Sequence, residues 1–471
     1  MTGPARAAPT AAPSFETLLA REGLAWMGQN TTHLEPPAEV VAALHDSTDR
    51  REFQLYAPAL GFEHLRELVL DDLGLAGTGA VAMITDGAVA GLHHVCTALA
   101  AGLSRLITTD PGWPWPARFV GFARVPVTSV PVYALEQGYR LGTDQLAAVI
   151  EPRSLIYLID PLNPLGSSYG RDELTAIAAL ARASDSLIVH DCTYRHFARG
   201  HTLVAELYPE GTLTTYSFSK WLGLAGLRVG ALVGPPGLMS TLTEVPANPL
   251  GAGIQGQRAA IAGLQVKAPW LSQLRAVNAA NQQVVSDAVT ASGLGRVLVQ
   301  PSHGNFLAVD IAGSGWTADG LCAALLARDV FIRPGTYQSP LFGERFVKVS
   351  TSVPPEWAER FADAWSSLSA PPLSASPPGS FAPTGQSFGL ESANRPDRSA
   401  QMRIRADGNE AVCAIEPVGE PATEPETVAG EVLVAGEAPV VKEAPTVGES
   451  PVLGEASSVV GEMPVTGETP L

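Results

Sequence analysis

Short apolar runs alternate with stretches of helical spacing along the middle of this chain. The apolar runs are Val127–Tyr133, Leu155–Asp160 and Ser186–Asp191, and the stretches between them, near 143–150 and 171–183, have the spacing of amphipathic helices. Strands separated by helices run mostly parallel in one sheet, and helices cover both faces of such a sheet. The sequence therefore predicts an α/β fold whose ligands bind at the carboxyl ends of the strands.

Length and charge limit the kinds of protein that this chain can be. Its 471 residues suffice for more than one domain. No run approaches the roughly 18 uncharged apolar residues that span a bilayer, and the N-terminus lacks a basic segment followed by an apolar one. The net charge of −17 argues against a nucleic-acid partner. We therefore expect a soluble cytoplasmic protein that binds neither nucleic acid nor membrane.

The four cysteines do not form a recognisable framework. Cys96, Cys192, Cys322 and Cys413 are far apart, and no two of them have the spacing of a zinc site or a redox pair. We interpret them as free thiols in a reducing compartment. The sequence thus predicts neither a metal site nor a disulfide.

One lysine occupies an unusual environment. Lys220 lies in the run Tyr216–Gly230, among small, hydroxyl-bearing and apolar residues that would remove its amine from water. Loss of hydration disfavours the charged amine and lowers its pKa, as a lysine that bonds covalently to a carbonyl requires. Eight residues later, the planar guanidinium of Arg228 can form two parallel hydrogen bonds with a phosphate, and Ser217 offers a hydroxyl for the same anion.

The Ser-x-Ser-Lys run and the glycines after it resemble the cofactor-lysine motif of fold type I pyridoxal-phosphate enzymes. Within these the chain is similar to the class I/II aminotransferase family, in the branch of histidinol-phosphate aminotransferase, over roughly residues 15–370. The resemblance implies the aspartate aminotransferase fold type I, a three-layer large domain on a mostly parallel sheet with a smaller C-terminal α/β domain. It also implies pyridoxal 5'-phosphate as cofactor, an amino acid or related amine as substrate, and a homodimer.

Two predicted strand ends carry residues where this family holds its cofactor. Asn163 lies in the turn Asn-Pro-Leu-Gly, and the resemblance implies that it donates to the phenolic oxygen of the cofactor and reaches the substrate. Asp191 ends an apolar strand, where a carboxylate is costly unless a cation such as a protonated pyridine nitrogen lies beside it. Tyr194 resembles the residue that hydrogen-bonds the phenolic oxygen. An ordinary turn at Asn163 is the alternative, because Asn-Pro and Gly are common turn residues.

Further contacts are implied around these residues. Gly87 and Ala88 open an apolar helix, and the unpaired N–H groups at a helix start can hold a phosphate. The resemblance implies that Trp113 stacks on the pyridine ring, with a packed loop tryptophan as the alternative. It also implies that Tyr56 reaches the phosphate of the neighbouring subunit, with an ordinary loop tyrosine as the alternative. Asn30, in a loop of the N-terminal segment, is expected to contact the substrate.

The resemblance and the composition divide the chain into four parts. Residues 1–45 form an N-terminal arm and first helix, residues 46–250 the large cofactor-binding domain, and residues 251–370 linking helices and a small domain. Residues 371–471 are rich in Pro, Gly and Glu, and thirteen acidic residues accompany one lysine from Asp407 to Glu468. Such a composition prevents a packed core, so we expect a disordered acidic tail.

The sequence departs from the family at one position. Family members that act on α-amino acids carry an arginine that grips the substrate carboxylate, and at that position this chain has Lys348. Lysine is a point charge without the bidentate fork of arginine. Lys348 could still attract a carboxylate, and Arg333 and Arg345 are further candidates for this task.

The sequence therefore favours a pyridoxal-phosphate-dependent aminotransferase that works through Lys220, with Asp191 and Tyr194 as further catalytic residues. A second hypothesis keeps the cofactor and replaces amino transfer by the reaction of a lyase, cyclase, decarboxylase or oxidase, as in natural-product branches of the family. A transcription regulator on the same fold is disfavoured, because little chain precedes Tyr56 and no basic patch is present.

Overall fold

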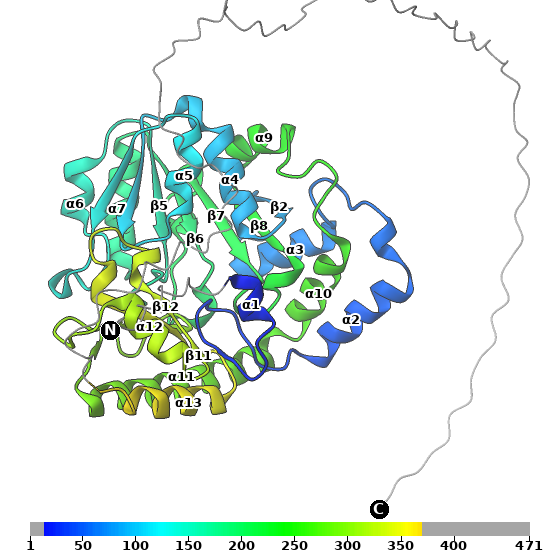
Figure 1. Cartoon of the computed structure of the whole chain (residues 1–471). Helices are drawn as coiled ribbons and strands as arrows, with labels where there is room; N and C mark the ends of the chain where they lie inside the picture. Colours follow the sequence, from blue (N-terminus) through cyan, green and yellow to red (C-terminus); the bar gives the residue numbers. More distant parts are fainter. Residues whose placement is uncertain (1–13, 370–471) are drawn as a thin grey trace, which may run out of the picture. The chain divides into compact units, whose positions relative to one another are not determined.

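A seven-stranded sheet forms the centre of the larger part of the protein (Figure 1). The computed structural model describes residues 14–369, so the expectation for residues 371–471 lies outside the described residues. The strand order is β2-β8-β7-β6-β5-β3-β4, in which β8 runs antiparallel to both neighbours and the other pairs are parallel. The predicted mostly parallel sheet is thereby confirmed. Its strands are β2 (Val81–Thr85), β3 (Arg105–Asp110), β4 (Val127–Pro131), β5 (Ser154–Ile159), β6 (Leu187–Asp191), β7 (Thr212–Ser217) and β8 (Gly230–Gly234).

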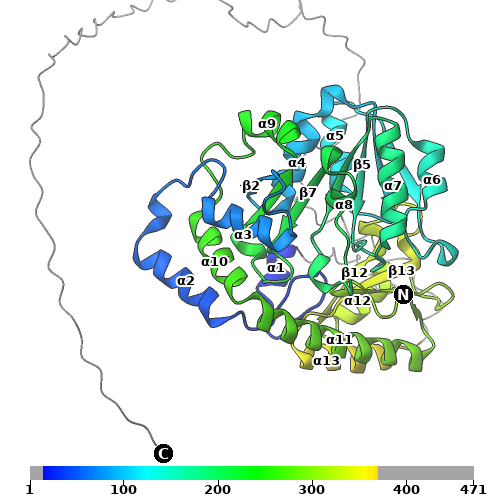
Figure 2. The same ribbon diagram turned by 180° about the vertical axis from the view of Figure 1, so that it is seen from behind.

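Helices cover both faces of this sheet, as its buried central strands require. The views in Figures 1 and 2 show α4 and α5 on one face and α7 and α8 on the other. Every residue of β5 and β7 is buried between these layers. The helices of this part are α2 (Ala38–Asp49), α3 (Glu63–Leu73), α4 (Ala88–Ala98), α5 (Trp115–Phe122), α6 (Thr143–Val149), α7 (Arg171–Ala183), α8 (Val204–Leu207), α9 (Pro236–Glu244) and α10 (Ile254–Gln265).

A second, four-stranded antiparallel sheet with the order β12-β13-β10-β9 has a core of its own. The long helix α11 (Lys267–Ser292) leads into it, and α13 packs along α11. This arrangement supports the expected small domain, although its limits at residues 251 and 370 stay a prediction. The elements are β9 (Arg296–Val297), β10 (Phe306–Asp310), α12 (Ala318–Leu326), β11 (Val330–Phe331), β12 (Arg333–Pro334), β13 (Phe346–Ser350) and α13 (Pro355–Ser366).

The N-terminal segment is attached to this second sheet region. After α1 (Phe15–Leu19), the short strand β1 (Ala25–Trp26) pairs in parallel with β11. The Met27 N–H donates to the Phe331 carbonyl oxygen at 2.8 Å, and the Ser350 N–H donates to the Met27 carbonyl oxygen at 2.7 Å. These bonds fix the start of the loop that contains Asn30.

The fold brings the predicted site residues to one edge of the large sheet. The parallel strands β3, β5, β6 and β7 end at the same edge, and the loops after them carry Trp113, Asn163, Tyr194 and Lys220. This edge is where ligands bind in open α/β sheets. Among the described residues, no helix combines the length and the apolar character needed to cross a membrane.

Candidate active site

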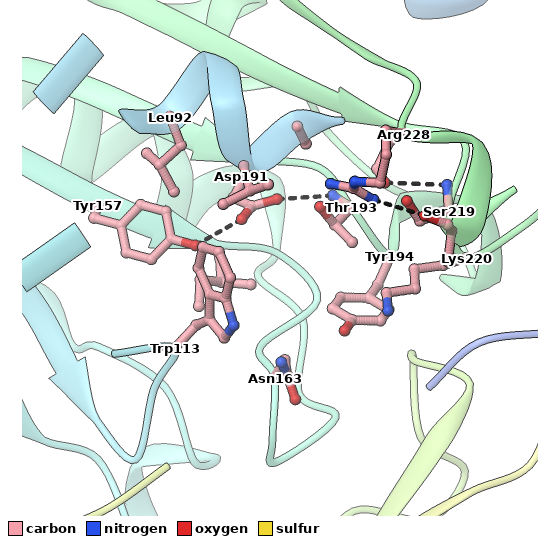
Figure 3. Close-up of a pocket in the computed structure, with 15 residues that line it drawn as sticks. Leu92, Trp113, Tyr157, Asn163, Asp191, Thr193, Tyr194, Ser219, Lys220 and Arg228 are labelled. Carbon is pink, nitrogen blue, oxygen red and sulfur yellow. Dashed lines mark hydrogen bonds between the residues drawn. The ribbon is translucent and has the colours of Figure 1, made fainter. Parts of the chain in front are cut away.

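A cavity of about 200 Å³ opens at this edge of the sheet (Figure 3). Asp191 and Tyr157 lie on one side of it, and Lys220, Ser219 and Arg228 lie on the other. A smaller cavity of about 130 Å³ shares Trp113, Asn163, Tyr194 and Lys220 with the first and continues toward the four-stranded sheet. The structure therefore gathers the predicted site residues around two joined cavities. The larger one is lined by Ala88, Val89, Leu92, Trp113, Tyr157, Ile159, Asn163, Asp191, Thr193, Tyr194, Ser217, Ser219, Lys220, Ala225 and Arg228.

Lys220 stands where the two cavities meet. Its side chain is half-buried, and Nζ donates to the carbonyl oxygen of Gln29 at 3.0 Å. Loss of hydration, together with the positive charges of Arg228 and Arg333, lowers the pKa of Lys220 to about 8. A substantial fraction of the amine is therefore neutral and nucleophilic near neutral pH.

Asp191 is held in place by three donors. The Tyr157 hydroxyl donates to Oδ2 at 2.6 Å, while Thr215 Oγ1 and the Thr193 N–H donate to Oδ1 at 3.1 and 3.0 Å. Burial and the nearby Asp191 charge raise the pKa of Tyr157 far above its usual value, so the phenol stays protonated and donates. Sequence reasoning missed Tyr157 and Thr215. Their signal was a hydroxyl-bearing side chain inside the fully buried strands β5 and β7.

The other side of the cavity presents donors suited to an anion. Gly87 has φ of +80° at the start of α4, and a Cβ there would lie 2.5 Å from Arg228 Nη2. The Arg228 guanidinium donates to the carbonyl oxygens of Ala225 and Asp86 at 2.7 and 3.2 Å, and its side chain is exposed. Ser217 Oγ accepts from the Ser219 N–H at 3.2 Å. A helix start, a guanidinium and a hydroxyl together can hold a phosphate.

Asn163 is an acceptor shared by three parts of the chain. Its Oδ1 accepts from Gln338 Nε2 at 2.9 Å, from Lys348 Nζ at 3.2 Å and from Asn30 Nδ2 at 3.4 Å. Asn30 Nδ2 also donates to the Tyr194 hydroxyl oxygen at 3.2 Å. The structure thus brings the predicted residues Asn30, Asn163, Tyr194 and Lys348 together. Gln338 was not predicted, because it lies in a loop without a recognisable pattern.

Two buried or half-buried cations line the smaller cavity. Lys348 on β13 and Arg333 on β12 are register partners, and Lys348 is only 5% exposed. Burial, Arg333 and Lys220 together hold the pKa of Lys348 well below its ordinary value. Burial also lowers the pKa of Arg333, whose guanidinium lies 4.8 Å from the centre of the Tyr337 ring. Arg345 is not brought to the cavity, since it lies 3.4 Å from Asp310 and stacks over Tyr133.

Tyr56 is the predicted cofactor contact that lies apart from the others. Its side chain is 79% exposed and lines neither of the two cavities. Trp113 lines both cavities and borders the space between Asp191 and Asn163 (Figure 3). Within one chain, the structure therefore assembles the predicted residues near Lys220, apart from Tyr56 and the alternative candidate Arg345.

The cavity lies at the carboxyl edge of a mostly parallel sheet. In it a lysine of lowered pKa faces a buried carboxylate and lies near donors for an anion. These features suit a phosphorylated cofactor that bonds to an amine. The family model described as aminotransferase class I and II matches residues 23–364. The chain belongs to this family, and it is a pyridoxal-phosphate-dependent aminotransferase.

Individual relatives agree with this assignment. A histidinol-phosphate aminotransferase of Rhodospirillum centenum is 29% identical over 318 residues, which cover 65% of this chain and 82% of the relative. An arginine–pyruvate transaminase of Pseudomonas aeruginosa is 29% identical over 304 residues, covering 62% and 77% of the two chains. The solved structure of an N-succinyldiaminopimelate aminotransferase from Mycobacterium tuberculosis matches with a TM-score of 0.66, at 23% identity and covering 74% and 95%. This last similarity supports the predicted fold.

The lowered pKa of Lys220 has a measurable consequence in the cofactor-free enzyme. Because the pKa is about 8, the neutral amine should become the main form as the pH rises through that value, whereas an ordinary lysine changes near pH 10.5. Labelling with acetic anhydride over a pH series, read by peptide mass spectrometry, should give a midpoint near pH 8 for Lys220. A short lysine peptide in the same tube is the control, and identical midpoints for both would contradict the prediction.

Proposed function

We propose that this enzyme transfers the amino group of an amino acid or related amine in the cavity between Lys220 and Asp191. The observation that carries the proposal is the pairing of a lysine of lowered pKa with a carboxylate fixed by Tyr157 and Thr215 across one cavity. Lys220 is the covalent attachment point for pyridoxal 5'-phosphate, and Asp191 is the partner of its pyridine nitrogen.

The residues of the cavity fit this cofactor. The Gly87 turn, the N–H of Ala88, Ser217 and Arg228 offer the donors that a phosphate needs. The lack of a side chain at Gly230 leaves room beside the Ala88 N–H, because a Cβ at residue 230 would lie 2.4 Å from the Ala88 nitrogen. Trp113 borders the cavity as a flat wall for an aromatic ring. The donor set therefore suits a phosphorylated pyridine.

The bound cofactor supplies an aldehyde that bonds to amines and a protonated pyridine ring that draws electrons from the substrate. The carboxylate of Asp191 would hold the proton on the pyridine nitrogen, and the three groups that donate to its oxygens fix its position. Lys220 Nζ, once free, takes the proton from the α-carbon of the substrate as a general base and returns it as an acid. A pKa near 8 suits both directions of this transfer at neutral pH.

Tyr194 and Asn163 orient the ring through its phenolic oxygen. The Tyr194 hydroxyl accepts from Asn30, which leaves its own proton available to donate into the cavity. Burial raises the pKa of Tyr194, so this proton is kept. With Oδ1 of Asn163 occupied by three donors, its amide N–H groups are directed elsewhere and can donate.

The substrate carries an acid group toward the smaller cavity. Arg333 provides positive charge there, and an anion bound beside Lys348 would favour the protonated form of this lysine, whose pKa is otherwise lowered. Asn30 borders the same space. In a largely buried cavity this charge favours an anionic substituent, and a carboxylate is the acid group common to amino acids. Lys348, Asn30 and Asn163 are therefore the proposed substrate contacts.

Replacing Lys220 tests the central assignment. The purified wild type should show the visible absorption band of bound cofactor, and this band should shift when the right amine from a panel is added without an acceptor. Lys220→Ala should lose the normal band and at least about four orders of magnitude in amino transfer, since it removes both the attachment point and the general base. Lys267→Arg, a lysine outside both cavities, is the matched control.

A normal band that survives in Lys220→Ala would contradict the assignment of this lysine. A band that shifts and then returns with a modified product, without release of a keto acid, would favour the lyase, cyclase, decarboxylase or oxidase hypothesis. A keto product with the cofactor left in its amine form would support amino transfer and identify the substrate class.

Removing the charge of Lys348 tests the substrate contact. Lys348→Met should raise KM for an amino acid about 10- to 100-fold, which is the effect of losing one charged hydrogen bond of roughly 1.5–3 kcal/mol. An amine of the same skeleton without the carboxylate should react about as well as with the wild type. Lys348→Arg should restore most of the discrimination. Equal losses for both compounds would contradict a carboxylate contact.

A homodimer completes the proposed site. Phe53, Leu55 and Tyr56 are all more than half exposed within four residues, a pattern typical of an interaction surface. The relatives' family uses a tyrosine of this position from the neighbouring subunit, and Tyr56 is free to take that role. The protein is proposed to act in the cytoplasm, where cysteines such as Cys96 and Cys322 would stay free of disulfides, as they are in the structure.

The role of Tyr56 is testable in the assembled enzyme. Tyr56→Phe should weaken cofactor binding about tenfold by removing one hydrogen bond to a charged phosphate, without changing the subunit number measured by light scattering. Phe122→Leu, at another exposed aromatic residue, is the control. A monomeric wild-type enzyme that binds its cofactor fully would contradict the shared site.

A further inference from the structure

A second cluster of chemically active side chains adjoins Asp191 and takes no part in the site described above. His190 and Cys192 flank Asp191 in the sequence, and His201 lies in the loop before α8. The three side chains are buried. One ring nitrogen of each histidine and the sulfur of Cys192 lie within 4.8 Å of one another. Imidazole and thiolate are the preferred ligands of Zn²⁺.

A buried carboxylate lies against the same histidines. Asp160 Oδ2 is 3.4 Å from His201 Nε2 and 3.7 Å from His190 Nε2. Its Oδ1 accepts from Ser168 Oγ at 2.6 Å and from the Tyr169 N–H at 3.3 Å, so Oδ2 is directed toward the two rings. A carboxylate removed from water favours a cation in its surroundings.

Several polar atoms of this cluster lack partners. Oδ2 of Asp160, Nε2 of His190 and Nδ1 of His201 are buried without a hydrogen-bond partner among the described residues. The 3.7 Å separation of His190 Nε2 from Asp160 is too long for a hydrogen bond. His201 Nε2 donates to the Asp160 carbonyl oxygen at 3.1 Å, which leaves Nδ1 with its lone pair. Such unmet groups are costly, and a coordinated cation would satisfy them.

We propose that His190, Cys192 and His201 bind one transition-metal cation of the Zn²⁺ class, with Asp160 as the neighbouring carboxylate. On binding, the Cys192 thiol releases its proton to solvent and its sulfur bonds to the metal. In the metal-free protein His190 Nδ1 accepts from the Val204 N–H at 3.3 Å, so Nε2 carries the ring proton. Coordination through Nε2 moves that proton to Nδ1 and gives up this long contact.

The proposed ion has a structural consequence for the enzyme. It would tie the end of β6, on both sides of Asp191 in the sequence, to the loop before α8. The hydrogen bond from His201 to the Asp160 carbonyl oxygen is the outer contact that metal-bound histidines usually make. Cysteine spacing predicted no metal site, because this cluster joins residues that only the fold brings together.

Metal content of the purified holoenzyme tests the proposal without any measurement of turnover. After equilibration with zinc and dialysis, the wild type should retain about one zinc ion per chain by elemental analysis. Cys192→Ser and His201→Gln should each lose most of it. Replacement by cobalt should give the wild type absorption bands at the red end of the visible spectrum, where the cofactor does not absorb, and these bands should be absent in both variants.

The control is His303→Gln, at a half-buried histidine whose Nδ1 also lacks a partner but which lies outside the three-residue group. It should keep the zinc of the wild type. If Cys192→Ser fails to fold, as judged by circular dichroism, His201→Gln alone decides. The proposal would be overturned if the wild type retained no more zinc than His201→Gln, showed no cobalt bands and showed no rise in Tm on addition of zinc. The cluster would then be a metal-free group of histidines and Asp160.

Discussion

Positive charge held away from water at the carboxyl edge of the large sheet is the constraint on which the site depends. Arg333 lowers the pKa of Lys220 and of Lys348, Lys220 also lowers the pKa of Lys348, and burial lowers the pKa of all three groups. Among the residues that line the two cavities, Asp191 is the only acid. An excess of buried cations is stabilised when anions bind. A phosphate on one side and a substrate acid group on the other would supply them.

The same edge explains why three distant parts of the chain must fold together. Asn163 follows β5 of the large sheet, yet its Oδ1 receives donors from the N-terminal loop and from the region of the four-stranded sheet. The N-terminal loop is fixed in turn by its pairing with β11 and β13. The side-chain oxygen of Asn163 thus links the loop after β5 to Lys348 on β13 and to Asn30 in the N-terminal loop.

The fold and the centre of the site were predictable because their signals are local. The alternation of apolar runs gave the parallel sheet, and the surroundings of Lys220 indicated its lowered pKa. The partners of Asp191 were hidden, since Tyr157 and Thr215 look like ordinary strand residues until β5, β6 and β7 are placed side by side. The contacts of Gln338 with Asn163 and of the Gln29 carbonyl oxygen with Lys220 could not be predicted either, because contacts between loops leave no periodic pattern in the sequence. Arg345 looked as suitable as Arg333, and only the fold turns it toward Asp310.

Lys348, predicted from the sequence to stand at the position of the family arginine, is accompanied in the smaller cavity by a second cation, Arg333. Lys348 Nζ lies 5.7 Å from the centre of the Phe306 ring and donates to Asn163, so these two contacts fix the position of its amine. Its register partner Arg333 retains the planar fork that lysine lacks, and it lines the same cavity. A substrate acid group would therefore contact the amine of Lys348 and the guanidinium of Arg333. The pairing of β12 with β13 sets the relative position of these two groups. This geometry favours an acid group displaced toward β12.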